Sequence, residues 1–150
     1  FLLVHDDGNN QDTLQARING YLQLNGNKYP AQAIHRIDYE TSGLVLFCKH
    51  PFFQAYCDKN MEEHHIKKEC ISIFNTIKNY KDCSLIQVTI LTGRKHQIRV
   101  QCASLNHPIL NDPLYGGKKI DNTGLLLQSH HIQFNDVDIT CPQEKRFIRK

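Results

Sequence analysis

A carboxylate and an arginine stand two residues apart in the segment 35–43, which reads His-Arg-Ile-Asp-Tyr-Glu-Thr-Ser-Gly. The apolar run 43–48 follows directly, so the segment is predicted to be a loop that ends at a rigid element. A functional carboxylate such as Asp38 needs this support, because packing then fixes its orientation. Thr41 and Ser42 add hydroxyls that can bond the backbone of the turn. An ordinary Asp turn beside a surface arginine fits the same residues, and the segment alone leaves both interpretations open.

A second segment, 92–99, gathers four basic or potentially basic side chains at a predicted strand-to-helix junction. Arg94 is placed beside a helix N-terminus, where backbone N–H groups favour an anion such as phosphate. His96 and Arg99 are three residues apart and share a helix face. Such a face could direct one arginine at a buried carboxylate while other groups hold an RNA backbone, because the guanidinium fork pairs with carboxylate or phosphate. The alternative is a solvated helix start.

Composition bounds the chain to one compact globular domain or a piece of a larger protein. It has 150 residues, 40% hydrophobic and 22% charged, with a net charge of +3 and a pI near 8.5. No apolar run is long enough to span a bilayer, and we expect no membrane partner and a cytoplasmic location. The basic residues form local groups typical of phosphate-binding surfaces: Lys67-Lys68, Arg94-Lys95 with Arg99, Lys118-Lys119 and 145–150.

The six cysteines do not indicate a disulfide framework or a metal site. No CxxC spacing occurs, and Cys48 and Cys102 lie inside apolar runs, where a thiol behaves as a small hydrophobe. We expect reduced, structural cysteines and no metal. A zinc site from His64, His65 and Cys70 is the remaining alternative, although the usual paired ligand spacing is missing.

The elements of the first third are predicted from capping and apolar spacing. Asp12-Thr13 can cap a helix whose apolar face repeats at 14, 18 and 22 and which ends at 25–27. The run 43–49 predicts one buried strand. Pro51 suits the first turn of a helix to about Glu63. Its inward face would hold Phe52, Phe53 and Tyr56.

The rest of the chain indicates short strands and one more helix. Isoleucines at 71 and 73, and apolar residues at 86, 88 and 90, alternate with polar ones, which is typical of half-buried strands. Apolar residues at 98, 102 and 105 predict a helix from about Lys95, closed by 106–108. Late strands are expected at Leu125–Leu127 and Ile132–Phe134, with turns at 122–124 and 135–136. Together these elements predict an α+β fold with a mixed or antiparallel sheet and flanking helices.

Three segments in order resemble the RluA-type family of RNA pseudouridine synthases. Residues 35–38 with 41–43 are similar to its catalytic HRLD…TSG motif, and 92–99 to its TGRxHQIR motif. Residues 107–116, a stiff loop with two prolines, resemble its HPIxGDxLYG motif. Residues 2–5 are similar to the stretch after the family's opening strand. The likeness covers nearly the whole chain.

The resemblance implies a pseudouridine-synthase-like catalytic core, with 1–150 as a single domain that lacks its first strand. It implies isomerisation of uridine to pseudouridine in ribosomal or transfer RNA, with no metal or organic cofactor. Asp38 would be the catalytic carboxylate, attacking C1′ of the ribose or removing a proton at C2′. Arg99 would pair with Asp38, and Arg36 would fill the space left by the target base. The remaining expected RNA-binding residues are His35, Thr41, Cys70, Arg94, His96 and Gln97.

Two departures from the family pattern keep a second hypothesis open. The family's base-stacking tyrosine is expected at position 70, where this chain has cysteine. The centre between Phe74 and Leu85 is shorter than in the family, and Gln128 stands where relatives often have histidine. A catalytically impaired relative that binds RNA is therefore the alternative to an active isomerase. The sequence indicates no oligomeric state.

Overall fold

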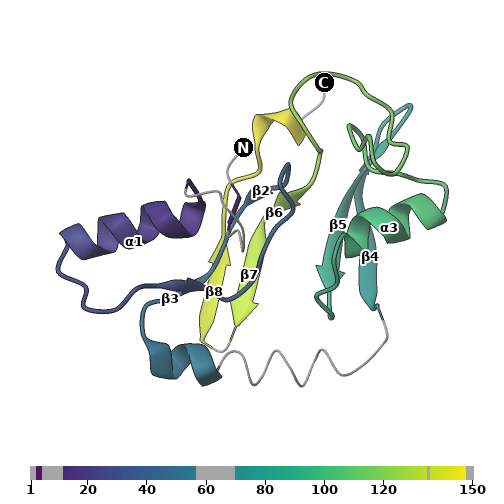
Figure 1. Ribbon diagram of the computed structural model, residues 1–150. Coiled ribbons are helices and arrows are strands. Elements are labelled where there is room, and N and C mark those ends of the chain that lie inside the picture. The colour runs from purple at the N-terminus through teal and green to yellow at the C-terminus, as the bar shows by residue number, and fades with distance from the viewer. Residues whose placement is uncertain (1–2, 5–11, 57–69, 135, 148–150) are drawn as a thin grey trace. The chain divides into compact units, whose positions relative to one another are not determined.

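The computed structural model describes residues 3–4, 12–56, 70–134 and 136–147. The chain divides into two compact units: Phe1–Met61 with Leu127–Gln143, and Glu62–Leu126 with Glu144–Lys150. The architecture is mixed, with few helices and short, mostly antiparallel strand pairs (Figure 1). In place of the one sheet predicted, the described strands form four separate two-stranded sheets. None of the described helices is long and apolar enough to cross a membrane.

Helix α1 (Leu14–Leu24) opens the first unit where the sequence predicts it. Thr13 is the N-cap, and its hydroxyl accepts a hydrogen bond from the Ala16 N–H at 3.2 Å. The helix is tied to the following strand by two of its amide side chains, which accept from backbone N–H groups. Asn19 Oδ1 accepts from Ala31 at 2.7 Å, and Gln15 Oε1 accepts from Ala33 at 3.2 Å. These bonds anchor the segment that leads to Asp38.

The single strand predicted over 43–49 is wrong. Two short strands replace it, β2 (Ser42–Gly43) and β3 (Phe47–Cys48). Strand β3 pairs antiparallel with β1 (Gln32–Ala33), whereas β2 runs parallel to β6 (Gln128–Ser129). The cause is Gly43, whose φ of 111° breaks the extended path, and a Cβ there would collide with the Ser129 backbone.

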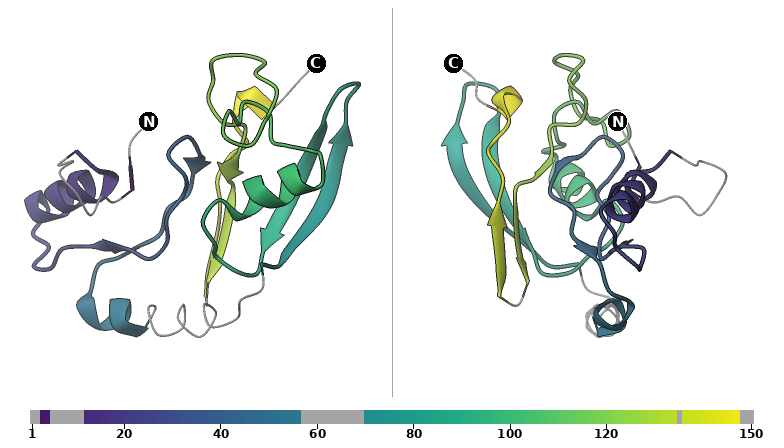
Figure 2. Two further views of the ribbon diagram at one scale, coloured as in Figure 1. Left: turned by 45° about the vertical axis from the view of Figure 1, so that its right-hand side comes forward. Right: turned by 90° about the vertical axis from the view of Figure 1, so that its left-hand side faces the viewer.

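The end of the first unit is a hairpin of β7 (His131–Phe134) and β8 (Val137–Thr140), drawn side by side in Figure 2. The strand predicted at Ile132–Phe134 is confirmed. The strand predicted at Leu125–Leu127 is wrong, because pairing with β2 begins only at Gln128. Of the turn predicted at 135–136, Asn135 lies outside the described residues.

Residues 51–56 are helical, as Pro51 predicts, and the remainder of that predicted helix lies outside the described residues. The predicted inward face is wrong for Phe52, which is 82% exposed, whereas Phe53 and Tyr56 are about half exposed and Phe53 lines a cavity of the first unit. Phe53 stacks on Tyr56 and meets Phe134 edge-on, with ring centroids 5.8 and 6.4 Å apart. Neighbouring helical residues differ by about 100°, so Phe52 cannot share the direction that Phe53 takes.

The second unit contains the β4–β5 hairpin, helix α3 and a long ordered loop (Figure 1). Strands β4 (Ser72–Asn79) and β5 (Ser84–Ile90) pair antiparallel with one irregularity between Thr76 and Lys78, and both confirm predicted strands. Helix α3 (Gln97–Ser104) is bonded to the start of β4, where Ser72 Oγ donates to Gln101 Oε1 at 2.7 Å. The unit closes with the short 3-10 helix η1 (Lys145–Phe147).

Helix α3 ends at Ser104, and residues 106–108 close it as the sequence predicts. Asn106 has a φ of 61°, its N–H donates to the Ala103 carbonyl, and the His107 N–H donates to the Cys102 carbonyl. This pair of bonds is a Schellman motif with asparagine at the left-handed position. The motif turns the chain sharply into the loop that follows, and that loop supplies the partners of Arg99.

Candidate active site

Asp38 lies on a loop of the first unit that connects β1 to β2. The loop is held at both ends by backbone bonds. The Ile34 N–H donates to the Leu46 carbonyl at 2.9 Å, and Thr41 donates to the Asp38 carbonyl at 2.9 Å, closing a turn. Asp38 is half-buried and Arg36 is exposed. The rigid element that was expected to support Asp38 therefore consists of two short strands, β2 and β3, and not of one long strand.

His35 has a structural part in this loop. Its Nε2 accepts a hydrogen bond from the Leu46 N–H at 3.1 Å. Burial lowers the pKa of His35, partly offset by a hydrogen bond with the Arg36 backbone. A ring that accepts at Nε2 must be neutral and carry its proton on Nδ1. His35 therefore fixes the path of the chain just before Arg36.

Thr41 holds a buried polar atom that the surrounding protein does not satisfy. The residue is 8% exposed, and its Oγ1 has no hydrogen-bond partner among the described residues. An unsatisfied buried hydroxyl costs about 1–3 kcal/mol. It stands three residues after Asp38, at the end of the same turn. Such a group beside a candidate catalytic carboxylate is a suitable partner for a ligand atom.

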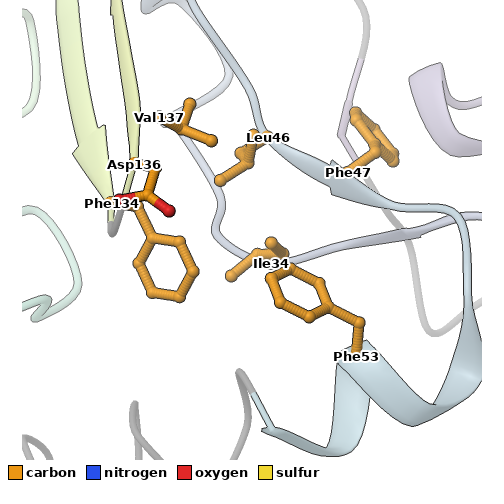
Figure 3. Close-up of a pocket in the computed structure, with 7 residues that line it drawn as sticks. All are labelled: Ile34, Leu46, Phe47, Phe53, Phe134, Asp136 and Val137. Carbon is orange, nitrogen blue, oxygen red and sulfur yellow. The ribbon is translucent and has the colours of Figure 1, made fainter.

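An apolar cavity of about 340 Å³ lies in the first unit (Figure 3). Ile34, Leu46 and Phe134 contribute apolar side chains to its wall, and Asp136 contributes a carboxylate. Ile34, one of the residues that line the cavity, directly precedes His35 in the sequence. None of the predicted site residues lines the cavity.

Gln97 joins three segments of the second unit. Its Oε1 accepts from the Thr92 hydroxyl at 2.9 Å and from the Arg94 N–H at 3.1 Å. Its Nε2 donates to the Ile71 carbonyl at 3.0 Å and to Ser72 Oγ at 2.9 Å. These four bonds use the whole capacity of the amide, which is buried. Gln97 positions the loop that carries Arg94, and its predicted contact with RNA stays a prediction.

Arg99 forms a buried, two-pronged ion pair with Asp112. Its Nε and Nη2 donate to Asp112 Oδ2 and Oδ1, each at 2.8 Å. The side chains are 11% and 0% exposed. Burial tends to raise the pKa of Asp112, but the hydrogen bonds and charge of Arg99, with the Tyr115 and Leu114 N–H groups, hold that pKa below its usual 3.8. Both groups are therefore ionised at neutral pH.

Tyr115 connects Arg99 with His96. The guanidinium carbon of Arg99 lies 5.1 Å from the centre of the Tyr115 ring, within the range of a cation–π contact. The Tyr115 hydroxyl is 2.9 Å from His96 Nδ1, and the two rings meet edge-on. His96 has a φ of 54° and begins α3. His96 and Arg99, predicted to share a helix face, thus converge on one tyrosine.

Cys70 lies two residues before β4 and is an exposed, free thiol. Its carbonyl accepts from Gln101 Nε2 at 2.8 Å, so the backbone of this position is fixed against α3. The buried Cys48 and Cys102 confirm their structural assignment, and burial raises the pKa of the Cys102 thiol. No cluster that could hold a metal occurs within the described ranges. The zinc alternative rests partly on His64 and His65, which lie outside those ranges.

The predicted site residues fall into two groups. His35, Arg36, Asp38 and Thr41 belong to the first unit, and Cys70, Arg94, His96, Gln97 and Arg99 to the second. The predicted pairing of Asp38 with Arg99 joins the two units and stays a prediction.

The sequence analysis missed two residues, Asp112 and Tyr115. Both lie in the segment 107–116, to which the sequence assigns only a stiff loop. The sequence does contain a signal for them, because Asp112 and Tyr115 stand inside one of the three motifs that carry the family resemblance.

Comparison with known proteins agrees with the resemblance. A model of the RNA pseudouridylate synthase family matches residues 2–71 and 54–104. An uncharacterized RNA pseudouridine synthase of Mycoplasma genitalium is 27% identical over 175 residues, covering 85% of this chain and 57% of that protein. One of Bacillus subtilis is 30% identical over 145 residues, covering 70% and 48%. The ribosomal large subunit pseudouridine synthase D of Zymomonas mobilis is 25% identical over 173 residues, covering 78% and 55%.

The chain spans about half the length of these relatives. The family match covers more than half of the chain and includes both the Asp38 loop and α3 with Arg99. The chain belongs to the RNA pseudouridylate synthase family.

Proposed function

We propose that this chain is the catalytic domain of an enzyme that isomerises uridine to pseudouridine in ribosomal or transfer RNA, in the cytoplasm and without a cofactor. One observation carries the proposal: the family match spans both the supported loop of Asp38 and the helix of Arg99. Two of the candidate groups that the reaction needs, a carboxylate and an oriented guanidinium, are thus present within matched sequence.

In the proposed reaction Asp38 acts on the ribose of the target uridine. The N1–C1′ bond breaks, the uracil turns, and a C5–C1′ bond forms. The proton on C5 is then lost to solvent, and N1 gains one, so the product is an isomer of the substrate. Asp38 starts this sequence either as a nucleophile at C1′ or as a base at C2′. Arg99 is proposed to pair with Asp38 and to hold it ionised and aimed.

Three basic side chains, of which Arg36 is exposed and Arg94 and His96 are half-buried, are proposed to hold the RNA. Arg36, two residues before Asp38 in sequence, would fill the space of the extruded base. Arg94 stands beside the start of α3, and its backbone is fixed by Gln97. Together with His96 it would contact phosphate, where the arginine fork makes paired bonds. Thr41 would donate to, or accept from, a substrate atom through its unsatisfied hydroxyl.

Tritium release from RNA that carries 5-³H-uridine tests the reaction directly, because forming the C5–C1′ bond expels the C5 hydrogen. We expect the wild-type chain to release label and Asp38→Asn to release none above background. Asp82→Asn, a matched change in the exposed β4–β5 turn, is the control and should release label normally. Equal release by wild type and Asp38→Asn would refute the assigned role of Asp38.

A specific observation favours a second candidate, an impaired relative that binds RNA without converting it. Position 70 is exposed and fixed in space but offers only a thiol. Stacking of a base on an aromatic ring contributes about 1–3 kcal/mol, which a thiol cannot supply. RNA that is retained on a filter by a chain releasing no tritium would support this second candidate.

A further inference from the structure

Arg99 has a protein partner that the proposed reaction itself does not require. A guanidinium carries five N–H donors in a rigid plane. Asp112 takes two of them, Nε and one on Nη2, which lie along one edge. The planar geometry directs the other three away from Asp112. The pair therefore fixes the guanidinium through the one edge that is bound to Asp112.

Asp112 is itself prevented from rotating. Its Oδ1 also accepts from the backbone N–H groups of Leu114 at 3.2 Å and Tyr115 at 3.3 Å. Its own carbonyl accepts from Gly117 at 2.8 Å, and its N–H donates to Ile109 at 3.2 Å. A Cβ at Gly117 would collide with the Ile109 carbonyl and the Asp112 backbone, so this crossing admits only glycine. The carboxylate is thus a fixed reference point for Arg99.

Tyr115 fixes the remaining freedom of the arginine. The two hydrogen bonds to Asp112 fix one edge of the guanidinium plane. The Tyr115 ring, whose centre lies 5.1 Å from the guanidinium carbon, limits the tilt of that plane. The hydroxyl of the same tyrosine lies 2.9 Å from His96 Nδ1, which holds the ring. Arg99 is consequently constrained by a charge at its edge and by an aromatic ring.

We propose that Asp112 and Tyr115 are positioning residues for the RNA reaction, which hold the guanidinium of Arg99 in one fixed orientation. The inference rests on the proposed function, in which Arg99 pairs with Asp38. A buried ion pair adds little stability compared with an apolar substitute. A fixed orientation of Arg99 for the proposed reaction would explain why an ion pair is buried at this position.

The test compares Asp112→Asn with Asp138→Asn, the same change at an exposed aspartate whose carboxylate lies 2.9 Å from His131. Tritium release is measured in a single turnover at saturating chain, and affinity by filter retention of the RNA. We expect Asp112→Asn to slow turnover about 10- to 100-fold, as an ångström-scale misplacement does. RNA affinity should change less than about threefold, and Asp138→Asn should match wild type in both measurements.

A double-mutant cycle separates positioning from general damage. In an Arg99→Lys background, where the fork is already gone, Asp112→Asn should slow turnover by less than about threefold more. Tyr115→Leu keeps the ion pair and should give a smaller loss of the same kind. This second variant keeps the inference testable should Asp112→Asn fold poorly. Effects of Asp112→Asn and Arg99→Lys that multiply independently would overturn the inference.

The Arg99 Nε–H resonance gives a readout independent of activity, assigned by its loss in Arg99→Lys. In wild type it should exchange slowly with water, and in Asp112→Asn it should exchange fast. An unchanged resonance, or wild-type turnover in Asp112→Asn, overturns the positioning role. A wild-type chain that releases no tritium overturns the proposed function and the reaction part of this inference together, while the resonance still decides whether Asp112 orients Arg99.

Discussion

The loop of Asp38 and the surroundings of Arg99 are held in different ways. The loop of Asp38 is closed by single bonds from backbone N–H groups, Asp38 is half-buried, and the Thr41 hydroxyl is unsatisfied among the described residues. Around Arg99 both charges are buried, and the carboxylate of Asp112 accepts four hydrogen bonds. The loop of Asp38 therefore leaves the Thr41 hydroxyl for a substrate, whereas the Asp112 carboxylate is fully satisfied within the protein.

The difference shows which group each unit holds firmly. A reacting carboxylate must change partners during a reaction, so a satisfied, rigid environment would oppose its work. A guanidinium that only orients another group gains from being immobile. Sites that violate local rules, such as the unsatisfied Thr41 hydroxyl, are expected where function is served.

The largest effect should come from removing one carboxylate from each region. Asp112→Asn leaves Arg99 buried without its ionic partner and should lower the free energy of unfolding by about 3–5 kcal/mol. Asp38→Asn removes a half-buried charge and should change it by less than about 1 kcal/mol. Urea unfolding of both variants measures this. A similar loss in the two would abolish the distinction between the regions.

Restoring an aromatic ring at position 70 should have the next largest effect. Cys70→Tyr offers a stacking face on a backbone already fixed by Gln101. RNA affinity should rise about 10- to 100-fold, equivalent to about 1–3 kcal/mol. Filter retention measures affinity, and tritium release shows whether turnover rises too. Cys83→Tyr, in the turn of the same hairpin, is the control and should bind as wild type does. No gain from Cys70→Tyr would separate position 70 from the RNA site.

Thr41→Val tests whether the first region gives up stability for function. Valine has the same shape without the hydroxyl, so the variant should be about 1 kcal/mol more stable. Turnover should fall if the hydroxyl serves the substrate. Thermal unfolding measures the change in stability, and tritium release measures the change in turnover. A destabilised Thr41→Val would mean that the hydroxyl is satisfied after all.

The smallest effect should be a difference in acid sensitivity between the regions. The pKa of His35 is lowered from 6.5 in the folded chain. As the pH falls, the unfolded chain therefore takes up a proton at His35 before the folded chain does. Stability from neutral His35 is complete above pH 6.5 and is lost as pH falls through the lower folded value. Asp112 has a pKa lowered from 3.8, so its contribution is complete above pH 3.8 and lost below it.

Stability measured against pH in wild type, His35→Gln and Asp112→Asn checks this order. His35→Gln should remove the loss that begins near pH 6.5, and Asp112→Asn the loss that begins below pH 3.8. Glutamine can still accept from the Leu46 N–H, so the bond itself is kept. Identical pH profiles in wild type and His35→Gln would show that the ring does not titrate with folding.

Local signals predicted the helices well and the strands unevenly. Thr13 and Asn106 stand at the ends of α1 and α3 because capping is decided within a few residues. The apolar run 43–49 misled because its composition suits a strand, while its pairing is divided between two distant partners. The prediction that Phe52 faces inward also failed, because the spacing of apolar residues does not say which surface a helix packs against.

The amino-acid sequence by itself determined the family, Asp38 as the candidate carboxylate, and the places where helices begin and end, because motifs and caps are short-range patterns. Only the tertiary structure decided that Arg99 is bound by Asp112 and Tyr115, and that Gln97 is fully used inside the protein. Asp112 follows Arg99 by thirteen residues, and the turn of the chain after α3 brings them together. No periodicity encodes such a contact, since it depends on how a loop folds back on a helix.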